Sequence, residues 1–99
     1  MLLQHGLFSS AYCWISNYAD VTPALHTAKA GYDVWLGNSR GNTFSRAHVK
    51  YNPDKDYKEF WNYSWFEMGK YDVPAVIDYI QHQTGGQKVA YAGHSQGTT

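Results

Sequence analysis

The chain has 99 residues, of which 43% are hydrophobic and 17% aromatic, which suits one small folded domain or part of one. Its eight basic and eight acidic side chains cancel, so the charge balance gives no electrostatic footprint for nucleic acid or an anionic membrane surface. No apolar run reaches the ~18 residues of a membrane-spanning helix, and one cysteine, Cys13, allows no internal disulfide and no metal-ligand cluster. We therefore expect no nucleic-acid partner, no transmembrane segment, no metal and no other cofactor.

The first part of the chain predicts two short strands separated by a helix. Met1–Gln4 is an apolar run that has the character of the end of a buried strand, and a glycine-containing turn follows it. Thr22 before Pro23 is typical of a helix N-cap and first turn, and Gly31 is typical of the residue just past a helix end. Tyr32–Leu36 predicts the second strand, which closes at the next glycine.

Residues 43–63 are the least regular part of the chain, with aromatic side chains interleaved among charged ones. Such a stretch is either a lid-like, substrate-facing insertion or a flap that packs over the edge of the sheet. We favour the packing role.

A helical pattern follows this stretch. Ser64 and Glu67 have the S-x-x-E form of a capping box, and Asp72 offers a second N-cap close to Pro74. An apolar stripe with helical spacing faces the sheet, formed by Val73, Val76, Ile77 and Ile80. The pattern leaves open whether there are two helices or one helix kinked at Pro74.

The third strand is predicted at Lys88–Ala92. Helices that alternate with short strands favour right-handed crossovers and a parallel sheet, so the fold class is α/β. No repeat, low-complexity segment or linker divides the chain. Because it begins inside a strand-like run and ends four residues past Ser95, we expect it to be a piece of a larger protein.

The third strand leads directly into a G-x-S-x-G pattern centred on Ser95. A serine hydroxyl becomes a useful nucleophile only when a base takes its proton and its oxygen stands clear of the backbone. A sharp strand-to-helix turn holds the oxygen clear of the backbone, and it strains the residue at its apex. Gly93 and Gly97 remove side chains that would collide there. We interpret Ser95 as a catalytic nucleophile; the alternative is a glycine-rich loop with a solvated serine.

Three motifs together resemble the acid lipase family of the α/β-hydrolases, the gastric and lysosomal acid lipase type: Gln4–Leu7, Gly37–Asn42 and Gly93–Thr99. The likeness covers nearly the whole chain. It implies that residues 1–99 are a partial α/β-hydrolase (lipase) domain, the first half of the catalytic domain to just past the nucleophile. It also implies that the strand at the start of the chain lies between the other two.

The resemblance implies roles for individual residues. Ser95 matches the nucleophile, and the backbone N–H groups of Leu7 and Gln96 match the oxyanion hole. The Asp and His of the triad should follow beyond Thr99, so the fragment alone should be inactive. The implied substrates are lipid esters, triacylglycerol or cholesteryl ester, at a lipid–water interface. The implied location is secreted or lysosomal.

Other functions remain possible at this point. A non-catalytic lipid- or sterol-binding relative, or a remnant with an incomplete triad, would keep the elbow, and an acyltransferase or peptidase would share the fold. His5 could approach the site as a base, but we favour a hydrogen-bonding structural role. We expect Arg40 to anchor its loop through a carboxylate. Because both outer strands leave open edges, the isolated chain should fold poorly or aggregate.

Overall fold

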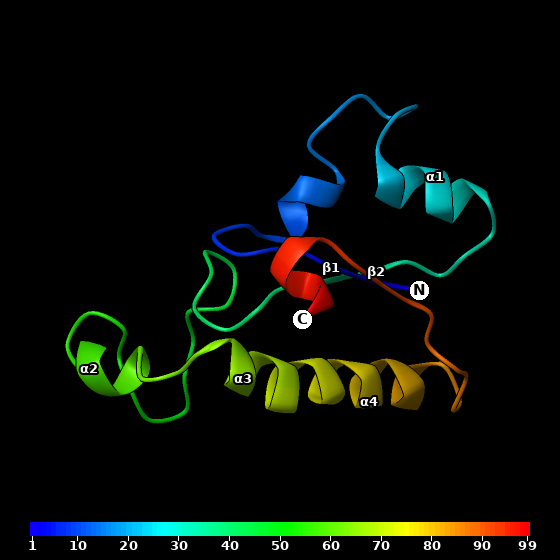
Figure 1. The fold of residues 1–99 in the computed structure, drawn as a ribbon. Helices are drawn as coiled ribbons and strands as arrows, with labels where there is room; N and C mark the ends of the chain where they lie inside the picture. Colours follow the sequence, from blue (N-terminus) through cyan, green and yellow to red (C-terminus); the bar gives the residue numbers. More distant parts are fainter.

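A computed structural model describes all residues from Met1 to Thr99. Its centre is a three-stranded parallel sheet with β1 (Leu2–Gln4) between β2 (Trp35–Gly37) and β3 (Tyr91–Gly93), as Figure 1 shows. The parallel α/β architecture and the central place of the first strand are therefore confirmed. Two short 3₁₀ turns complete the sheet side of the molecule, at Ala11–Trp14 and Ser95–Thr98.

The outer strands are shorter than the sequence runs that predict them. Leu2 pairs with Trp35 on one side and with Tyr91 on the other, and the register continues for three residues on each strand. Residues 32–34 and 88–90 therefore precede the paired region. A residue belongs to a strand only when it pairs with a neighbouring strand, and β1 has only three residues to pair with.

The first helix, α1 (Pro23–Lys29), begins and ends at the predicted residues. Its start depends on the proline in the first turn, because the Thr22 side chain makes no capping bond and its buried hydroxyl has no partner. Thr22 thus occupies the predicted N-cap position, but its side chain makes no capping hydrogen bond. At the other end, Gly31 has a φ of 95° and donates its N–H to the carbonyl of Ala28, which satisfies part of the last turn.

The sequence left open whether this part of the chain forms two helices or one helix kinked at Pro74. The structure has one continuous helical run. It consists of α3 (Trp65–Glu67), a π-helical turn at Met68–Asp72, and α4 (Val73–Gln83). The N–H that follows the π turn bonds to the carbonyl of Met68, five residues earlier. Pro74 has no N–H to donate and crowds the carbonyl one turn back, so the wider turn accommodates it without ending the helix.

The capping box at the start of this run is confirmed. The Ser64 hydroxyl accepts the Phe66 N–H, and a Glu67 carboxylate oxygen accepts the Ser64 N–H at 2.8 Å. The hydrogen bonds from the Ser64 hydroxyl and N–H lower the pKa of Glu67. Asp72, by contrast, lies inside the helical run and caps nothing, so the second N-cap expected there is wrong. Its carboxylate is engaged elsewhere.

The irregular stretch at residues 43–63 contains one short helix, α2 (Tyr57–Phe60). Figure 1 shows α2 beyond the start of α3, away from the sheet. Phe60 is buried, but Trp61 and Tyr63 line a cavity that is described below. The favoured interpretation, a flap over the sheet edge, is therefore wrong for this segment, and its last residues face the cavity instead.

The core is small for a chain of this length. Ten of the 99 residues are buried, and the apolar ones are Leu2, Leu3, Ala24, Phe60 and Ile80. The predicted stripe on α4 is confirmed, since Ile80 is buried and the other three positions are half-buried. The radius of gyration is 14.5 Å, above the roughly 13 Å of a compact chain of this length. None of the helices combines the length and the apolarity that crossing a membrane requires.

We predict that residues 1–99, produced alone, unfold without cooperativity, because so little apolar surface is buried and both outer strand edges are open. Circular dichroism and tryptophan fluorescence during heating would measure this. The expected result is a gradual loss of signal or aggregation. Coincident sigmoidal transitions by both probes would contradict it.

Candidate active site

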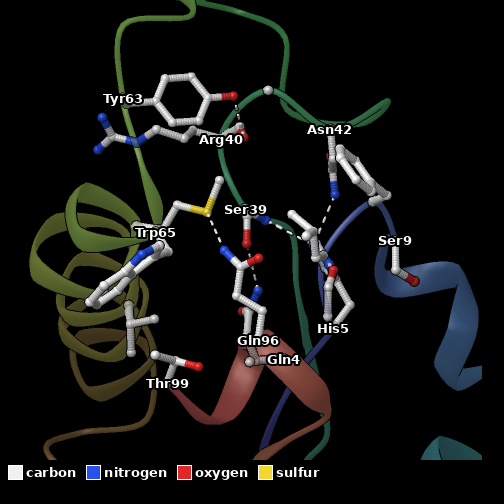
Figure 2. Close-up of a pocket in the computed structure, with 18 of the residues that line it drawn as sticks. Gln4, His5, Ser9, Ser39, Arg40, Asn42, Tyr63, Trp65, Gln96 and Thr99 are labelled. Carbon is white, nitrogen blue, oxygen red and sulfur yellow. Dashed lines mark hydrogen bonds between the residues drawn. The ribbon is translucent and has the colours of Figure 1, made fainter.

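Three loops meet at the carboxyl end of the sheet, where parallel α/β folds place their ligands. They are the turn after β1 (residues 5–9), the loop after β2 (residues 38–42), and the 3₁₀ turn Ser95–Thr98 after β3. Together with the start of the long helix they line a cavity of about 820 Å³. Figure 2 shows side chains from these segments converging on it.

Ser95 lies at a sharp turn between β3 and the 3₁₀ turn. Its φ is 54°, in the left-handed region that residues with a side chain seldom adopt. On the strand side, His94 donates its N–H to the Gln4 carbonyl at 3.0 Å, which extends the sheet up to the turn. On the other side, the Gly97 N–H bonds to the His94 carbonyl at 2.9 Å. The geometry matches the strained apex that the sequence pattern predicts.

The glycines around Ser95 are required by close backbone contacts. A Cβ at Gly93 would collide with the carbonyl of Gly97, and a Cβ at Gly97 would lie 2.6 Å from the Gln4 carbonyl oxygen. A Cβ at Gly6 would lie 2.8 Å from the Cβ of Ser95. The elbow therefore packs directly against β1 and against the turn that follows it.

Ser95 is exposed, and its hydroxyl has no hydrogen-bond partner among residues 1–99. Gly6, which lies against the Ser95 side chain, and Gln96, the next residue in the chain, both line the cavity. No group of three or more His, Cys, Asp or Glu side chains is placed to hold a metal ion. Within this chain, Ser95 stands at the apex of the turn, and no side chain accepts a hydrogen bond from its hydroxyl.

The two predicted oxyanion donors face the same cavity. Leu7 and Gln96 both line it, one from the turn after β1 and the other from the residue after Ser95. Neither backbone N–H donates a hydrogen bond to any group in the chain. The backbone N–H groups of Leu7 and Gln96 are therefore both without an acceptor in the chain.

His5 is 4% exposed, and both of its ring nitrogens are hydrogen-bonded. Nδ1 lies 2.7 Å from the Gly6 carbonyl oxygen, and Nε2 accepts the Ser39 N–H at 3.0 Å. The Asn42 amide also lies 3.0 Å from Nε2, and Figure 2 shows His5, Ser39 and Asn42 among the side chains that line the cavity. Neither nitrogen is free to take a proton from Ser95, so the base role is wrong and the structural role is confirmed.

Arg40 forms the expected tie to a carboxylate, and its partner is Asp72 in the π turn. Arg40 Nε donates to Asp72 Oδ1 at 2.8 Å, and the Arg40 backbone N–H donates to Oδ2 at 3.2 Å. The side-chain hydrogen bond to Asp72 raises the pKa of Arg40. The Arg40 guanidinium also lies over the ring of Tyr63, whose hydroxyl donates to the Arg40 carbonyl at 3.0 Å, and burial raises the pKa of Tyr63.

The apolar wall of the cavity was not foreseen from the sequence. It is formed by Phe8, Trp61, Trp65, Met68 and Val73. Met68 also accepts a hydrogen bond at its sulfur from the Gln96 side chain, at 3.5 Å. The many aromatic residues at positions 51–66 were the sequence feature that could have indicated this wall. Whether their side chains point toward the cavity, however, depends on the helix geometry, which the sequence alone does not give.

A family model described as "alpha/beta hydrolase fold" matches residues 1–99. The chain belongs to the α/β-hydrolase family. Within that family, gastric triacylglycerol lipase from Mus musculus is 59% identical over 97 residues, which are 98% of this chain and 24% of that protein.

Two human proteins are similar to the chain to nearly the same degree. Gastric triacylglycerol lipase from Homo sapiens is 56% identical over 99 residues, all of this chain and 24% of that lipase. Lipase member K from Homo sapiens is 54% identical over 97 residues, 98% of this chain and 24% of the relative. The chain spans about a quarter of the length of the curated relatives it matches. The resemblance to gastric lipase that the motifs indicate is thereby confirmed.

We predict that Gly97→Ala destabilises the elbow, because the new Cβ would lie 2.6 Å from the Gln4 carbonyl. Relieving the overlap should cost about 1–3 kcal/mol of unfolding free energy in the natural gene product. Gly69→Ala is the matched control. It meets nothing within 4 Å and lies in a helical turn, so it should be neutral or stabilise by up to about 1 kcal/mol. Equal midpoints in urea for the two variants would contradict the close contact.

Proposed function

We propose that Ser95 is the nucleophile of a carboxylic ester hydrolase that acts on lipid esters through an acyl-enzyme. The observation that carries this is the strained Ser95, with φ 54°, beside two N–H groups that have no acceptor in the chain. The hydroxyl oxygen would attack the ester carbonyl carbon while a base takes its proton. The alcohol would leave with a proton, and water would then release the acid.

Leu7 and Gln96 would stabilise this reaction with their backbone N–H groups. The tetrahedral intermediate places a negative charge on the former carbonyl oxygen, and fixed main-chain donors hold that charge without reorganising. Losing one such donor typically reduces the rate by about 10²–10³-fold. Because the donors belong to the backbone, the shape of the two turns determines how well they work, and the side chains of these residues do not.

The substrate class is proposed from the cavity wall and from the relatives. Phe8, Trp65 and Met68 offer an apolar surface next to the elbow, which suits an acyl chain. Leu7 is 57% exposed and Phe8 is fully exposed, and both line the cavity, so they offer an apolar surface to a lipid–water interface. The similar proteins named triacylglycerol lipases support triacylglycerol as the substrate, with cholesteryl ester as the second candidate ester.

A base is needed that residues 1–99 do not place beside Ser95. We propose that the natural gene product supplies an Asp and a His, in that order, after Ser95. Residues 1–99 alone would then be inactive. A second candidate function is lipid binding without catalysis. It is favoured by the combination of apolar side chains that line the cavity and a Ser95 Oγ that has no hydrogen-bond partner in this chain.

Ser95→Ala in the natural gene product should abolish covalent labelling by a fluorophosphonate probe, because the only activated oxygen is removed. Ser16→Ala is the matched control, since Ser16 is exposed and lies outside the cavity, and its labelling should be unchanged. Gel fluorescence and mass spectrometry of the labelled peptide would measure this. Labelling that persists in Ser95→Ala would refute the nucleophile. A wild-type protein that binds triacylglycerol but is never labelled would favour lipid binding.

A further inference from the structure

The peptide group between Gly6 and Leu7 carries one of the two proposed oxyanion donors. Its carbonyl, on Gly6, lies 2.7 Å from His5 Nδ1 and accepts the Ser9 N–H at 3.3 Å. This peptide is trans, so its carbonyl and its N–H point in opposite directions. Any group that fixes the Gly6 carbonyl therefore also fixes the direction of the Leu7 N–H.

The hydrogen bonds of His5 determine which ring nitrogen carries the proton. The Ser39 N–H can only donate, so Nε2 must accept. The Gly6 carbonyl can only accept, so Nδ1 must donate. Both ends of the ring thus require the same neutral form, with the proton on Nδ1.

The loop after β2 keeps the His5 ring in this orientation. The Asn42 amide nitrogen lies 3.0 Å from His5 Nε2 and 2.8 Å from the Asn38 side-chain oxygen. The orientation of that amide is itself fixed, because its oxygen accepts the Phe44 N–H at 3.0 Å. The ring is 4% exposed, so water does not compete for these bonds.

The turn that His5 supports needs such a restraint. Phe8, directly after Leu7, has a φ of 54°, a conformation that costs free energy for a residue with a side chain. Without bonds to hold it, a strained turn relaxes, and the Leu7 N–H turns with it. A hydrogen bond to the Gly6 carbonyl also polarises that peptide and makes its N–H a better donor.

We propose that His5 is a positioning residue, which aims and polarises the Leu7 N–H by donating from Nδ1 to the Gly6 carbonyl. It acts through this peptide group and does not touch the reacting atoms. The inference rests on the proposed function, since it concerns the oxyanion site of that reaction. It extends the role of His5 from holding the fold to setting the rate.

Two substitutions of His5 in the natural gene product separate the functions of its two ring nitrogens. The side-chain amide of His5→Asn can replace the Nδ1 donor to Gly6 but does not reach the loop after β2. The longer His5→Gln reaches Ser39 and loses the short donor to Gly6. His82→Gln is the control, because His82 is exposed on α4 and makes no side-chain hydrogen bond.

The readouts are kcat and KM for a soluble ester, and the infrared carbonyl band of an acyl group trapped on Ser95. For His5→Gln we expect kcat to fall about tenfold or more, short of the roughly 10²–10³-fold loss of a whole donor. Its KM should stay within about twofold, since an oxyanion donor acts on the transition state, and the carbonyl band should move to higher wavenumber. His5→Asn should lose clearly less kcat. Equal losses in both variants, or an unmoved band in His5→Gln, would overturn the proposal.

A measurement on the wild-type protein does not depend on how the variants fold. Long-range ¹H–¹⁵N NMR of ¹⁵N-histidine-labelled protein should show a proton on Nδ1 of His5 and none on Nε2. A proton on Nε2 would overturn the proposal by itself. Activity that survives Ser95→Ala would instead refute the proposed function, so the two failures are distinguishable.

Discussion

The parts of the candidate site are held together at Gln4, the last residue of the central strand. Its backbone carbonyl accepts the His94 N–H at 3.0 Å, and its side-chain amide donates to the Ser39 hydroxyl at 2.9 Å. One buried residue thus contacts the elbow on one side and the loop after β2 on the other. Because β1 lies between β2 and β3, a shift of its register would separate the loops that meet at the cavity.

The loop after β2 makes contacts on two sides. On one side, Ser39 and Asn42 bind the His5 ring, and this ring contacts the turn that carries the proposed oxyanion donor. On the other side, Arg40 binds Asp72 in the π turn, which belongs to the helical run that carries part of the apolar wall of the cavity. This ion pair is partly exposed, so its geometry matters more than its strength. The same short loop thereby fixes the polar and the apolar sides of the site.

The sequence predicted those features that local chemistry decides. Gly31 marks a helix end because it adopts a positive φ, and the pattern around Ser95 indicates a tight turn because only glycine tolerates the contacts there. Features that depend on distant partners were not predictable. Asp72 resembled an N-cap, but its carboxylate meets Arg40 from another loop, and the wide turn at Met68–Asp72 has no local signature besides the nearby proline.

We propose above all that an anionic oxygen formed on the substrate is held by backbone N–H groups beside Ser95. A crystal structure of the natural gene product after reaction with an alkyl phosphonate would test it directly, because the adduct imitates the tetrahedral intermediate. We expect phosphorus bonded to Ser95 Oγ and one phosphonyl oxygen about 2.7–3.1 Å from both the Leu7 and the Gln96 nitrogen. An adduct on another residue, or an oxygen turned away from both N–H groups, would contradict it.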